Sequence, residues 1–195
     1  MEYREILENA RKIMAPNCRV CRECNGVACR GEIPGTGGKG TGRAFIHSFE
    51  YLAGIKIHMD LIYANQGQDT SCSFFGQTFA GPVFAAPISG LSNNYNGYLS
   101  EKTYAEALVP GTKAAGCAAF TGDGAADFFF TDPLSAVAAA DGVAIPTIKP
   151  WDKDKVLEKI RLGASRRYGP MHGYRLCWTP PSGCCRKAGL FKRRG

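Results

Sequence analysis

The apolar positions in the second half of the chain change period several times, and each change marks a predicted element. Short continuous apolar runs are typical of strands buried on both faces, whereas apolar residues three or four apart are typical of helices. After Gly81 the two patterns alternate three times, which predicts an α/β fold with a parallel sheet covered by helices. The predicted strands cover 83–88, 117–121 and 143–148, and the predicted helices cover 101–115, 132–139 and 152–162.

The residues before Gly81 follow no such alternation. We predict two helices, a cysteine loop, a glycine-rich loop and a hairpin around Gly76. In chain order these elements cover 3–13, 18–29, 35–42, 43–52, and 70–75 with 77–79. The expected organisation is an N-terminal cap over 1–68 and an incomplete βα barrel over 69–162.

The charge of the chain is concentrated after Leu162. Residues 1–162 hold 16 Lys and Arg against 17 Asp and Glu, a net −1, and residues 163–195 hold eight basic residues and no acid, a net +8. Together they account for the total of +7. A nucleic-acid binder carries such charge on a folded face. The residues up to Leu162 offer no such face, so we expect no nucleic-acid partner.

The basic tail, residues 163–195, has two interpretations. It could be a basic binding arm, or it could be without function, as a disordered tail or as out-of-frame translation of GC-rich DNA. Its codons, read from the second base, can spell a helix end, a strand containing M-D-I-D and a glycine-containing turn. The glycine that overlaps Trp178 and Thr179 is forced, because TGG followed by A leaves no other choice. We favour a frameshift near codon 163, which would make the tail non-native.

Whether cysteines form disulfides or take other roles depends on the redox state of the compartment in which the protein resides. The sequence has neither a run of about 18 apolar residues nor a basic-then-apolar N-terminal signal, so we expect a soluble cytoplasmic protein without a membrane partner. There, nine cysteines favour metal, cluster or redox roles over disulfides. The tail contains three of the nine, Cys177, Cys184 and Cys185, which we discount.

The strongest candidate chemistry is a run of four cysteines, Cys18, Cys21, Cys24 and Cys29. Four thiolates this close in sequence can converge on zinc or on an Fe–S cluster. The spacing approximates the bacterial ferredoxin run, with four residues rather than three before the last cysteine. Interleaved arginines would offset the thiolate charge. The alternative is a set of reduced structural or surface cysteines.

A series of short motifs resembles one enzyme family in its order. The segments GPVFAAPISG at 81–90, AAFTG at 118–122 and IPTIK at 145–149 follow a hairpin with DTS at 69–71 and FFG at 74–76. These segments resemble the first three barrel strands and the bottom hairpin of the FMN-dependent α-hydroxy-acid oxidases and dehydrogenases. The N-terminal half looks most like the anaerobic bacterial branch of this glycolate and lactate oxidase group. The resemblance covers about residues 1–162.

This resemblance implies a (β/α)₈ barrel that binds FMN at the C-terminal ends of its strands and oxidises a 2-hydroxy acid to a 2-keto acid. By the same resemblance, the main chain of Ala86, Pro87, Ile88 and Ser89 faces the flavin, with Ser89 as a polar contact. Thr121 stands where relatives carry a Ser or Thr near the isoalloxazine.

Relatives carry the motif Gln-x-Tyr in the third strand. This chain departs from that motif, and its nearest match is Thr147-x-Lys149. A lysine there would stabilise negative charge on the flavin or on a substrate carboxylate. The alternative is a solvated lysine at the end of a strand.

Several of the family's functional groups have no match here. They are a general-base His, a carboxylate-binding Arg, a Lys beside the reduced flavin and a phosphate site on the last strands. His47, His58 and His172 lie in no such motif, and we expect surface or packing roles for the first two.

We therefore expect a truncated oxidoreductase that is inactive as written, from a family that is often homo-oligomeric. A cluster near FMN would favour an electron-transfer partner over oxygen. The alternative function is a small Cys-rich metal or Fe–S protein with a basic arm.

Two further motifs are interpreted as structural. Gly35, Gly37 and Gly40 match a dinucleotide-binding spacing, but no strand precedes them, so we predict a loop that could cover the barrel mouth. Asp123 and Asp127 follow a predicted strand, where barrel loops hold functional groups. We expect cap and turn roles for both.

Overall fold

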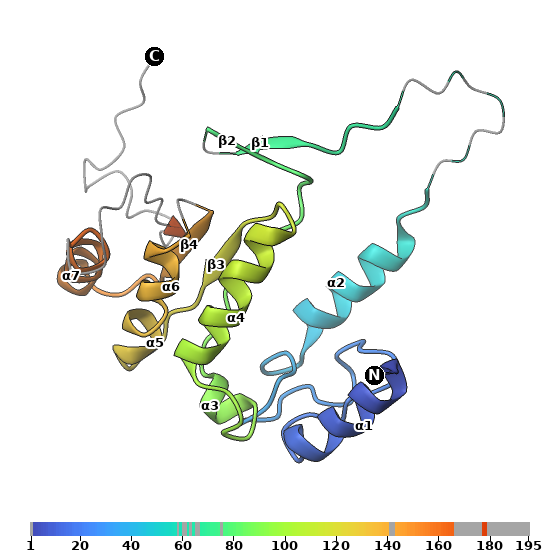
Figure 1. The fold of residues 1–195 in the computed structure, drawn as a ribbon. Helices are drawn as coiled ribbons and strands as arrows, with labels where there is room; N and C mark the ends of the chain where they lie inside the picture. Colours follow the sequence, from blue (N-terminus) through green and yellow to red (C-terminus); the bar gives the residue numbers. More distant parts are fainter. Residues whose placement is uncertain are drawn as a thin grey trace. The chain divides into compact units, whose positions relative to one another are not determined.

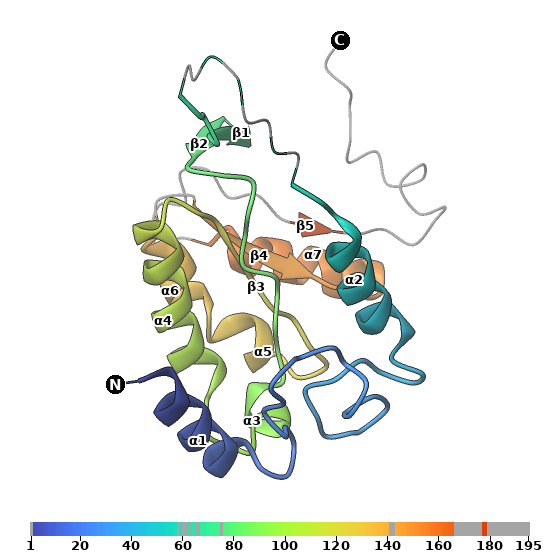
Figure 2. The ribbon, with the colours of Figure 1, turned by 90° about the vertical axis from the view of Figure 1, so that its right-hand side faces the viewer.

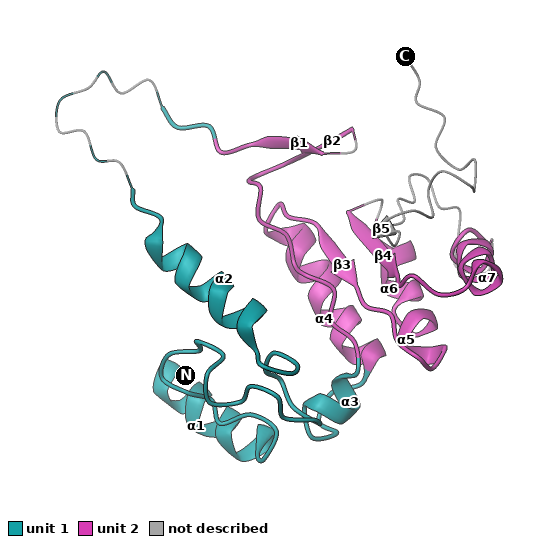
Figure 3. Cartoon of the chain, turned by 180° about the vertical axis from the view of Figure 1, so that it is seen from behind, with its two compact units in different colours: residues 1–69, 90–100 teal, residues 70–89, 101–195 magenta. Residues whose placement is uncertain are grey.

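The computed structural model of the protein describes residues 2–57, 59, 62, 64, 67–74, 76–140 and 143–165, together with the backbone of 177–178. The chain divides into unit 1, residues 1–69 and 90–100, and unit 2, residues 70–89 and 101–195 (Figure 3). The sequence predicted a single boundary near residue 68. In the structure residues 90–100 instead return to unit 1.

Unit 1 contains three helices, α1 (Tyr3–Met14), α2 (Arg43–Gly54) and the short α3 (Leu91–Asn94) (Figure 1). The first two confirm the helices predicted from the sequence. At the start of α1 the backbone N–H of Glu2 donates to the Glu5 carboxylate at 3.0 Å, one half of a capping box. None of the described side chains of α1 is buried.

Asparagines join residues 90–100 to the rest of unit 1. The Asn17 amide donates to the Asn93 carbonyl at 2.8 Å, and the Asn94 side chain accepts from the N–H of Gly35 at 3.2 Å. The Asn96 amide donates to the Ala15 carbonyl at 2.8 Å. These contacts are hydrogen bonds rather than apolar packing, so hydrophobic periodicity could not have predicted them.

Unit 2 begins with the predicted hairpin, which is confirmed. The strands β1 (Cys72–Phe74) and β2 (Gln77–Phe79) pair antiparallel with Ser73 opposite Thr78. The ring of Phe84, in the segment that follows, stacks on Phe74 at 5.5 Å and meets Phe79 edge-on at 5.4 Å. Aromatic packing therefore ties the hairpin to the start of the parallel segments.

The parallel sheet is also confirmed. It contains β3 (Ala119–Thr121), β4 (Ala144–Ile148) and β5 (Cys177–Trp178), in that order (Figure 2). Phe120 pairs with Ile145, and Thr147 pairs with Cys177. The predicted strand at 83–88 joins β3 only through a parallel bridge between Ala85 and Ala119. The two residues of β5 lie in the tail, for which the sequence indicated no strand, so the backbone of that segment does contribute to the sheet.

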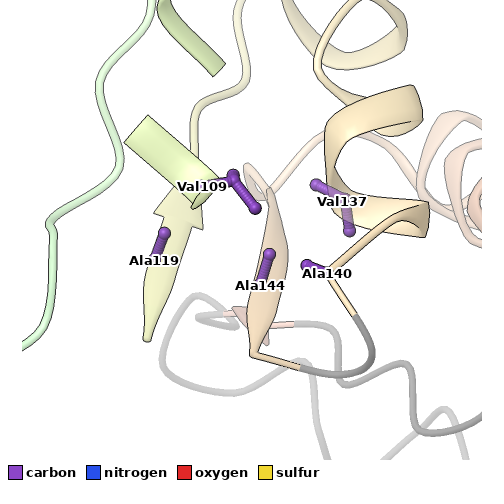
Figure 4. Close-up of a cluster of buried hydrophobic side chains, with 5 residues drawn as sticks. All are labelled: Val109, Ala119, Val137, Ala140 and Ala144. Carbon is purple, nitrogen blue, oxygen red and sulfur yellow. The ribbon is translucent and has the colours of Figure 1, made fainter. Parts of the chain in front are cut away.

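Helices pack on this sheet through two apolar clusters. Between the sheet and the helices α4 (Glu101–Ala114) and α6 (Leu134–Ala138) lie the buried side chains Val109, Ala119, Val137, Ala140 and Ala144 (Figure 4). Alanines on both strands let the helices approach closely. The second cluster, Phe130, Leu134, Ile148 and Val156, joins α5 (Phe128–Thr131) and α7 (Lys153–Gly163) to β4.

The helix predicted at 132–139 is confirmed as the shorter α6, and the sequence did not predict the separate short helix α5 that precedes it. Pro133 lies at the break, and its ring removes the N–H that a continuous helix would need. The helix predicted at 152–162 is confirmed as α7, whose first turn is capped by the Asp152 carboxylate accepting from the Lys155 N–H at 3.0 Å. Within the described ranges, no helix has the length and apolar character needed to cross a bilayer.

The packing of the first apolar cluster leads to a testable prediction about the stability of the protein. Val137 is 3% exposed, whereas Val83, in the same unit, is 72% exposed. We expect Val137→Ala to lower the free energy of unfolding by about 1.5 kcal/mol, because lost burial outweighs the better helix propensity of alanine. The control Val83→Ala should change it by less than about 0.5 kcal/mol. Urea unfolding followed by Trp fluorescence measures both, and equal effects would contradict this packing.

Candidate functional site

Asp123 is the centre of the C-terminal edge of the parallel sheet. It follows β3 directly and is 2% exposed. One carboxylate oxygen, Oδ1, accepts from the Gly124 N–H at 2.8 Å and from Lys159 Nζ at 2.7 Å. The other, Oδ2, accepts from the Lys149 N–H at 2.9 Å and from Trp151 Nε1 at 2.7 Å. One carboxylate thus joins the loops after β3 and β4 to helix α7.

The segment before β3 reaches the same edge. The Ser89 hydroxyl donates to the Asp123 backbone carbonyl at 2.6 Å. Between them lies Gly122, where a Cβ atom would collide with the Ile88 carbonyl oxygen. A glycine at 122 is therefore needed for the two loops to lie this close.

Electrostatics favours the ionised form of Asp123. Burial by itself raises the pKa of this carboxyl, but the hydrogen bonds from Lys159, from the Lys149 N–H and from Trp151, with the charge of Lys159, outweigh it and hold the pKa below its usual value. The Lys159 ammonium also lies 4.9 Å from the centre of the Phe130 ring and 5.9 Å from that of Trp151. A buried ion pair with all these partners is a rigid connection rather than a solvated charge.

The structure places the predicted flavin-binding residues in different surroundings. Ala86, Pro87 and Ile88 are exposed, with Ile88 at 36%. The Ser89 side chain is half-buried and already donates to Asp123. Thr121 is buried at 4% exposure.

Thr121 faces α4 rather than the exposed edge. With Glu101 and Tyr104 it lines a cavity of about 10 Å³. That volume is close to the minimum for one water molecule, so no cofactor ring fits there.

The two candidates on β4 differ from each other. The Thr147 hydroxyl is buried and has no hydrogen-bond partner among the described residues. The Lys149 side chain is exposed just beyond the strand, while its N–H is held by Asp123. The C-terminal end of β4 therefore carries the buried Thr147 hydroxyl, which has no partner among the described residues, and the exposed side chain of Lys149.

The sequence interpretation of Asp123 as a cap or turn residue is wrong. Its carboxylate is buried and joins distant segments, because Trp151 and Lys159 reach it from 28 and 36 positions along the chain. Neither partner was singled out in the sequence. The available signal was a lysine on the otherwise apolar face of a predicted helix, beside Val156 and Ile160. Asp127 lies at the N-cap position of α5 without a capping hydrogen bond from its side chain, and it pairs with Lys155 at 3.4 Å near the surface.

Another cavity, of about 320 Å³, lies between α4 and α6. Its lining includes Val109, Pro110, Ala136 and Ala140. Both helices end shortly before the next strand begins, so this cavity lies toward the N-terminal ends of the strands. Parallel α/β proteins bind ligands at the opposite edge.

The four candidate metal ligands lie in one loop of unit 1. Cys18 and Cys29 are half-buried, Cys21 and Cys24 are exposed, and all four are free thiols. The Val20 N–H donates to the Cys18 sulfur at 3.4 Å. This geometry needs Val20 at a φ of +45°, a region that β-branched residues rarely occupy.

The glycine-rich loop packs against this cysteine loop. The Gly31 N–H donates to the Gly38 carbonyl at 2.8 Å. A Cβ atom at Gly37 would lie 2.6 Å from the Cys29 sulfur. No strand precedes these glycines among the described residues, in agreement with the rejection of a dinucleotide site. Of these glycines, Gly37 is the one that a close approach to Cys29 requires.

Charges in the cysteine loop act on one another. Partial burial raises the pKa of Cys24, and the neighbouring Cys18, Cys29 and Cys21 thiolates raise it further. Burial also raises the pKa of Tyr95, with smaller contributions from Cys18 and Cys24. The charges of the other three cysteines thus act on Cys24, and those of Cys18 and Cys24 act on Tyr95. As the side chains stand, no group of three or more His, Cys, Asp or Glu in the described part of the chain is arranged to hold a metal ion.

An ion pair spans this loop. Arg19 donates to both carboxylate oxygens of Glu32, at 2.6 and 3.0 Å, and to the Ala28 carbonyl at 2.9 Å. The hydrogen bond with Glu32 raises the pKa of Arg19 and lowers that of Glu32. The positive charge of Arg19 therefore stays beside the cysteines.

His47, the histidine among the described residues, takes no part in either site. His47 is exposed and lies against the Tyr51 ring at 6.4 Å, which confirms a surface role. His58 and His172 lie outside the described residues.

The Asp123 carboxylate makes a substitution prediction. Because all four groups that contact it are donors, the NH₂ of Asn in Asp123→Asn would face two of them and leave Lys159 buried without a counter-charge. We expect a loss of about 3–5 kcal/mol in the free energy of unfolding. The control Asp127→Asn should lose less than about 1 kcal/mol, since its ion pair is near the surface. Urea titration of both variants checks this, and similar losses would refute the central role of Asp123.

The lowered pKa of Asp123 predicts acid sensitivity. The unfolded carboxyl, with a pKa of about 3.9, binds a proton at a higher pH than the folded one. The contribution is therefore complete above the unfolded pKa and is lost as the pH falls through the folded pKa. Below about pH 5, the unfolding free energy of the wild type should fall more steeply than that of Asp123→Asn. Parallel pH profiles in urea titrations would contradict this.

No protein-family model, no curated protein and no solved structure matches this chain. What these two sites do is therefore inferred from their own residues, geometry and charges.

Proposed function

We propose that this chain is the first part of an FMN-dependent oxidoreductase that oxidises a 2-hydroxy acid to a 2-keto acid on a (β/α)₈ barrel. One observation carries the proposal. Three successive parallel segments end at one edge, where Ser89, Asp123 and Lys149 hydrogen-bond their loops into a single structure. Ligands of parallel α/β proteins bind at this edge of the sheet. The order of the segments is also the one that the sequence motifs predict.

The residues of this edge fit FMN in part. A flavin ring needs main-chain N–H and C=O groups at its polar rim, and the exposed segment of Ala86, Pro87 and Ile88 would offer them, except that Pro87 has no N–H. The buried Thr147 hydroxyl, without a partner among the described residues, is suited to a further polar contact. Lys149 offers a cation at the same strand end. Ser89 and Thr121 fit less well, because the first is engaged with Asp123 and the second faces α4.

When bound, FMN would supply the chemistry by accepting a hydride from the substrate carbon. The protein groups described here would orient it. Asp123 holds the loops after β3 and β4 at a fixed separation, and Lys149 stabilises negative charge at the ring or at a substrate carboxylate. Rigid support of this kind raises rates by keeping reacting groups in position.

Residues 1–162 contain no match to the family's proton-abstracting His or carboxylate-binding Arg. We therefore propose that the chain as given does not turn over substrate. A cytoplasmic location, homo-oligomeric assembly and an electron-transfer partner belong to the same proposal. The second candidate function, a small metal or Fe–S protein with a basic arm, is favoured by the four free cysteines of one short loop, Cys18, Cys21, Cys24 and Cys29.

The proposal is tested by resequencing the DNA across codons 155–195 and expressing the protein with its frame restored. We expect a yellow protein whose flavin absorbance bleaches on addition of a 2-hydroxy acid. Lys149→Met should slow this reduction about 10²-fold, as the loss of one stabilising charge does elsewhere. Lys153→Met, which removes an exposed lysine in α7, is the matched control. An intact frame that stops soon after codon 195, in a chain that folds and binds metal but no flavin, would favour the second function.

A further inference from the structure

The apolar stripe of α2 is covered over its first half only. Phe45, Phe49 and Leu52 follow one another at helical spacing along one face of this helix. Phe45 is half-buried and packs on Gly26, where a Cβ atom would collide with its ring. At the other end Leu52 is exposed, and a Cβ atom at Gly54 would meet no described residue outside its own helix within 4 Å. The stripe therefore extends beyond the part of unit 1 that buries it.

Large apolar side chains are exposed at this end of α2. Their exposed fractions are 65% for Tyr51, 66% for Leu52, 59% for Ile55 and 87% for Ile57, and together they form what we call the α2 patch. Figure 1 shows this end of the helix extending away from the loops of unit 1. Single exposed apolar residues are normal, but a group of neighbouring ones marks a contact surface.

The size of the α2 patch indicates a small interface. Burying one large apolar side chain removes about 60–120 Å² from water, on the usual relation between area and free energy. The α2 patch would thus contribute roughly 250–500 Å² per copy in a contact between two copies. Interfaces of this size are at the low end of specific ones, so any such complex should dissociate on dilution.

Charged residues flank the α2 patch symmetrically. Glu50 lies three positions before Ala53 and Lys56 three positions after it, and both are exposed. The Lys56 ammonium donates to the Ala53 carbonyl at 3.4 Å, which places this cation at the C-terminal end of the helix. Two such segments that cross antiparallel about a two-fold axis at Ala53 would bring Glu50 of each copy to Lys56 of the other. The same register places Tyr51 opposite Ile55, so charges and apolar side chains are both matched.

We propose that the α2 patch binds the same patch of a second copy of this chain, in a two-fold symmetric dimer. A surface that is complementary to itself suits a second copy, because a two-fold axis makes every contact twice. Ala53 and Gly54, at the axis, are small enough for the two helices to approach closely. This dimer gives a surface to the homo-oligomeric assembly proposed above, and it needs neither the flavin nor residues of unit 2.

The test is sedimentation velocity of the full chain over a range of concentrations. We expect a reversible equilibrium between monomer and dimer in the micromolar range, as small interfaces give. Glu50→Lys and Lys56→Glu should each raise the Kd by about tenfold or more, because each brings like charges together twice. The double variant, Glu50→Lys with Lys56→Glu, restores opposite charges and should return the Kd to within about threefold of the wild-type value.

Lys12→Glu is the matched control, since it reverses an exposed lysine of α1 in the same unit and should leave the Kd unchanged. Circular dichroism of each variant separates a lost contact from a lost fold. A wild type that stays monomeric would overturn the proposal and would point to another part of the same chain as the cover of the α2 patch. A dimer that the single reversals do not weaken, or that the double variant does not restore, would overturn it as well. No flavin or restored frame enters this test, so its failure is distinct from failure of the proposed function.

Discussion

The ion pair between Asp123 and Lys159 is the interaction on which the C-terminal edge of the sheet depends. Both side chains are buried, at 2% and 3% exposure, and their charged atoms lie 2.7 Å apart. Burying two charges costs several kcal/mol per ion in effective desolvation, and only good geometry with further hydrogen bonds offsets it. Here the carboxylate has three other donors, and the ammonium lies near two aromatic rings.

That arrangement has a structural consequence for any ligand at this edge. Asp123 follows β3, Lys149 and Trp151 follow β4, and Lys159 belongs to α7, so a single carboxylate sets the separation of two loops and a helix. Apolar packing alone would fix the positions of these loops and of α7 less tightly, because it is not directional. A site that has to hold a flat, polar cofactor benefits from loops whose positions are set by hydrogen bonds of defined length and angle.

The two units are stabilised by different means. In unit 2, apolar clusters beneath α4, α6 and α7 bury the sheet. In unit 1, asparagine hydrogen bonds, the pair of Arg19 with Glu32 and closely packed glycines replace most of that burial. Loops held in this way leave Cys21 and Cys24 exposed.

The local elements could be predicted from the sequence by itself. The period of apolar residues located α1, α2, α4, α7 and the hairpin, and uninterrupted apolar runs located β3 and β4. The spacing of the four cysteines likewise identified one loop as a candidate centre. These features are local, since each depends on residues within a few positions of one another.

Only the tertiary structure decided the rest. Burial of Asp123 depends on donors 26 to 36 positions away, the return of residues 90–100 to unit 1 depends on asparagine side chains, and the side of β3 on which Thr121 lies depends on where α4 packs. A carboxylate after a strand looks the same in sequence whether it faces water or a buried lysine. What distinguishes the two is the desolvation and pairing that arise when distant segments meet, and no local period encodes that.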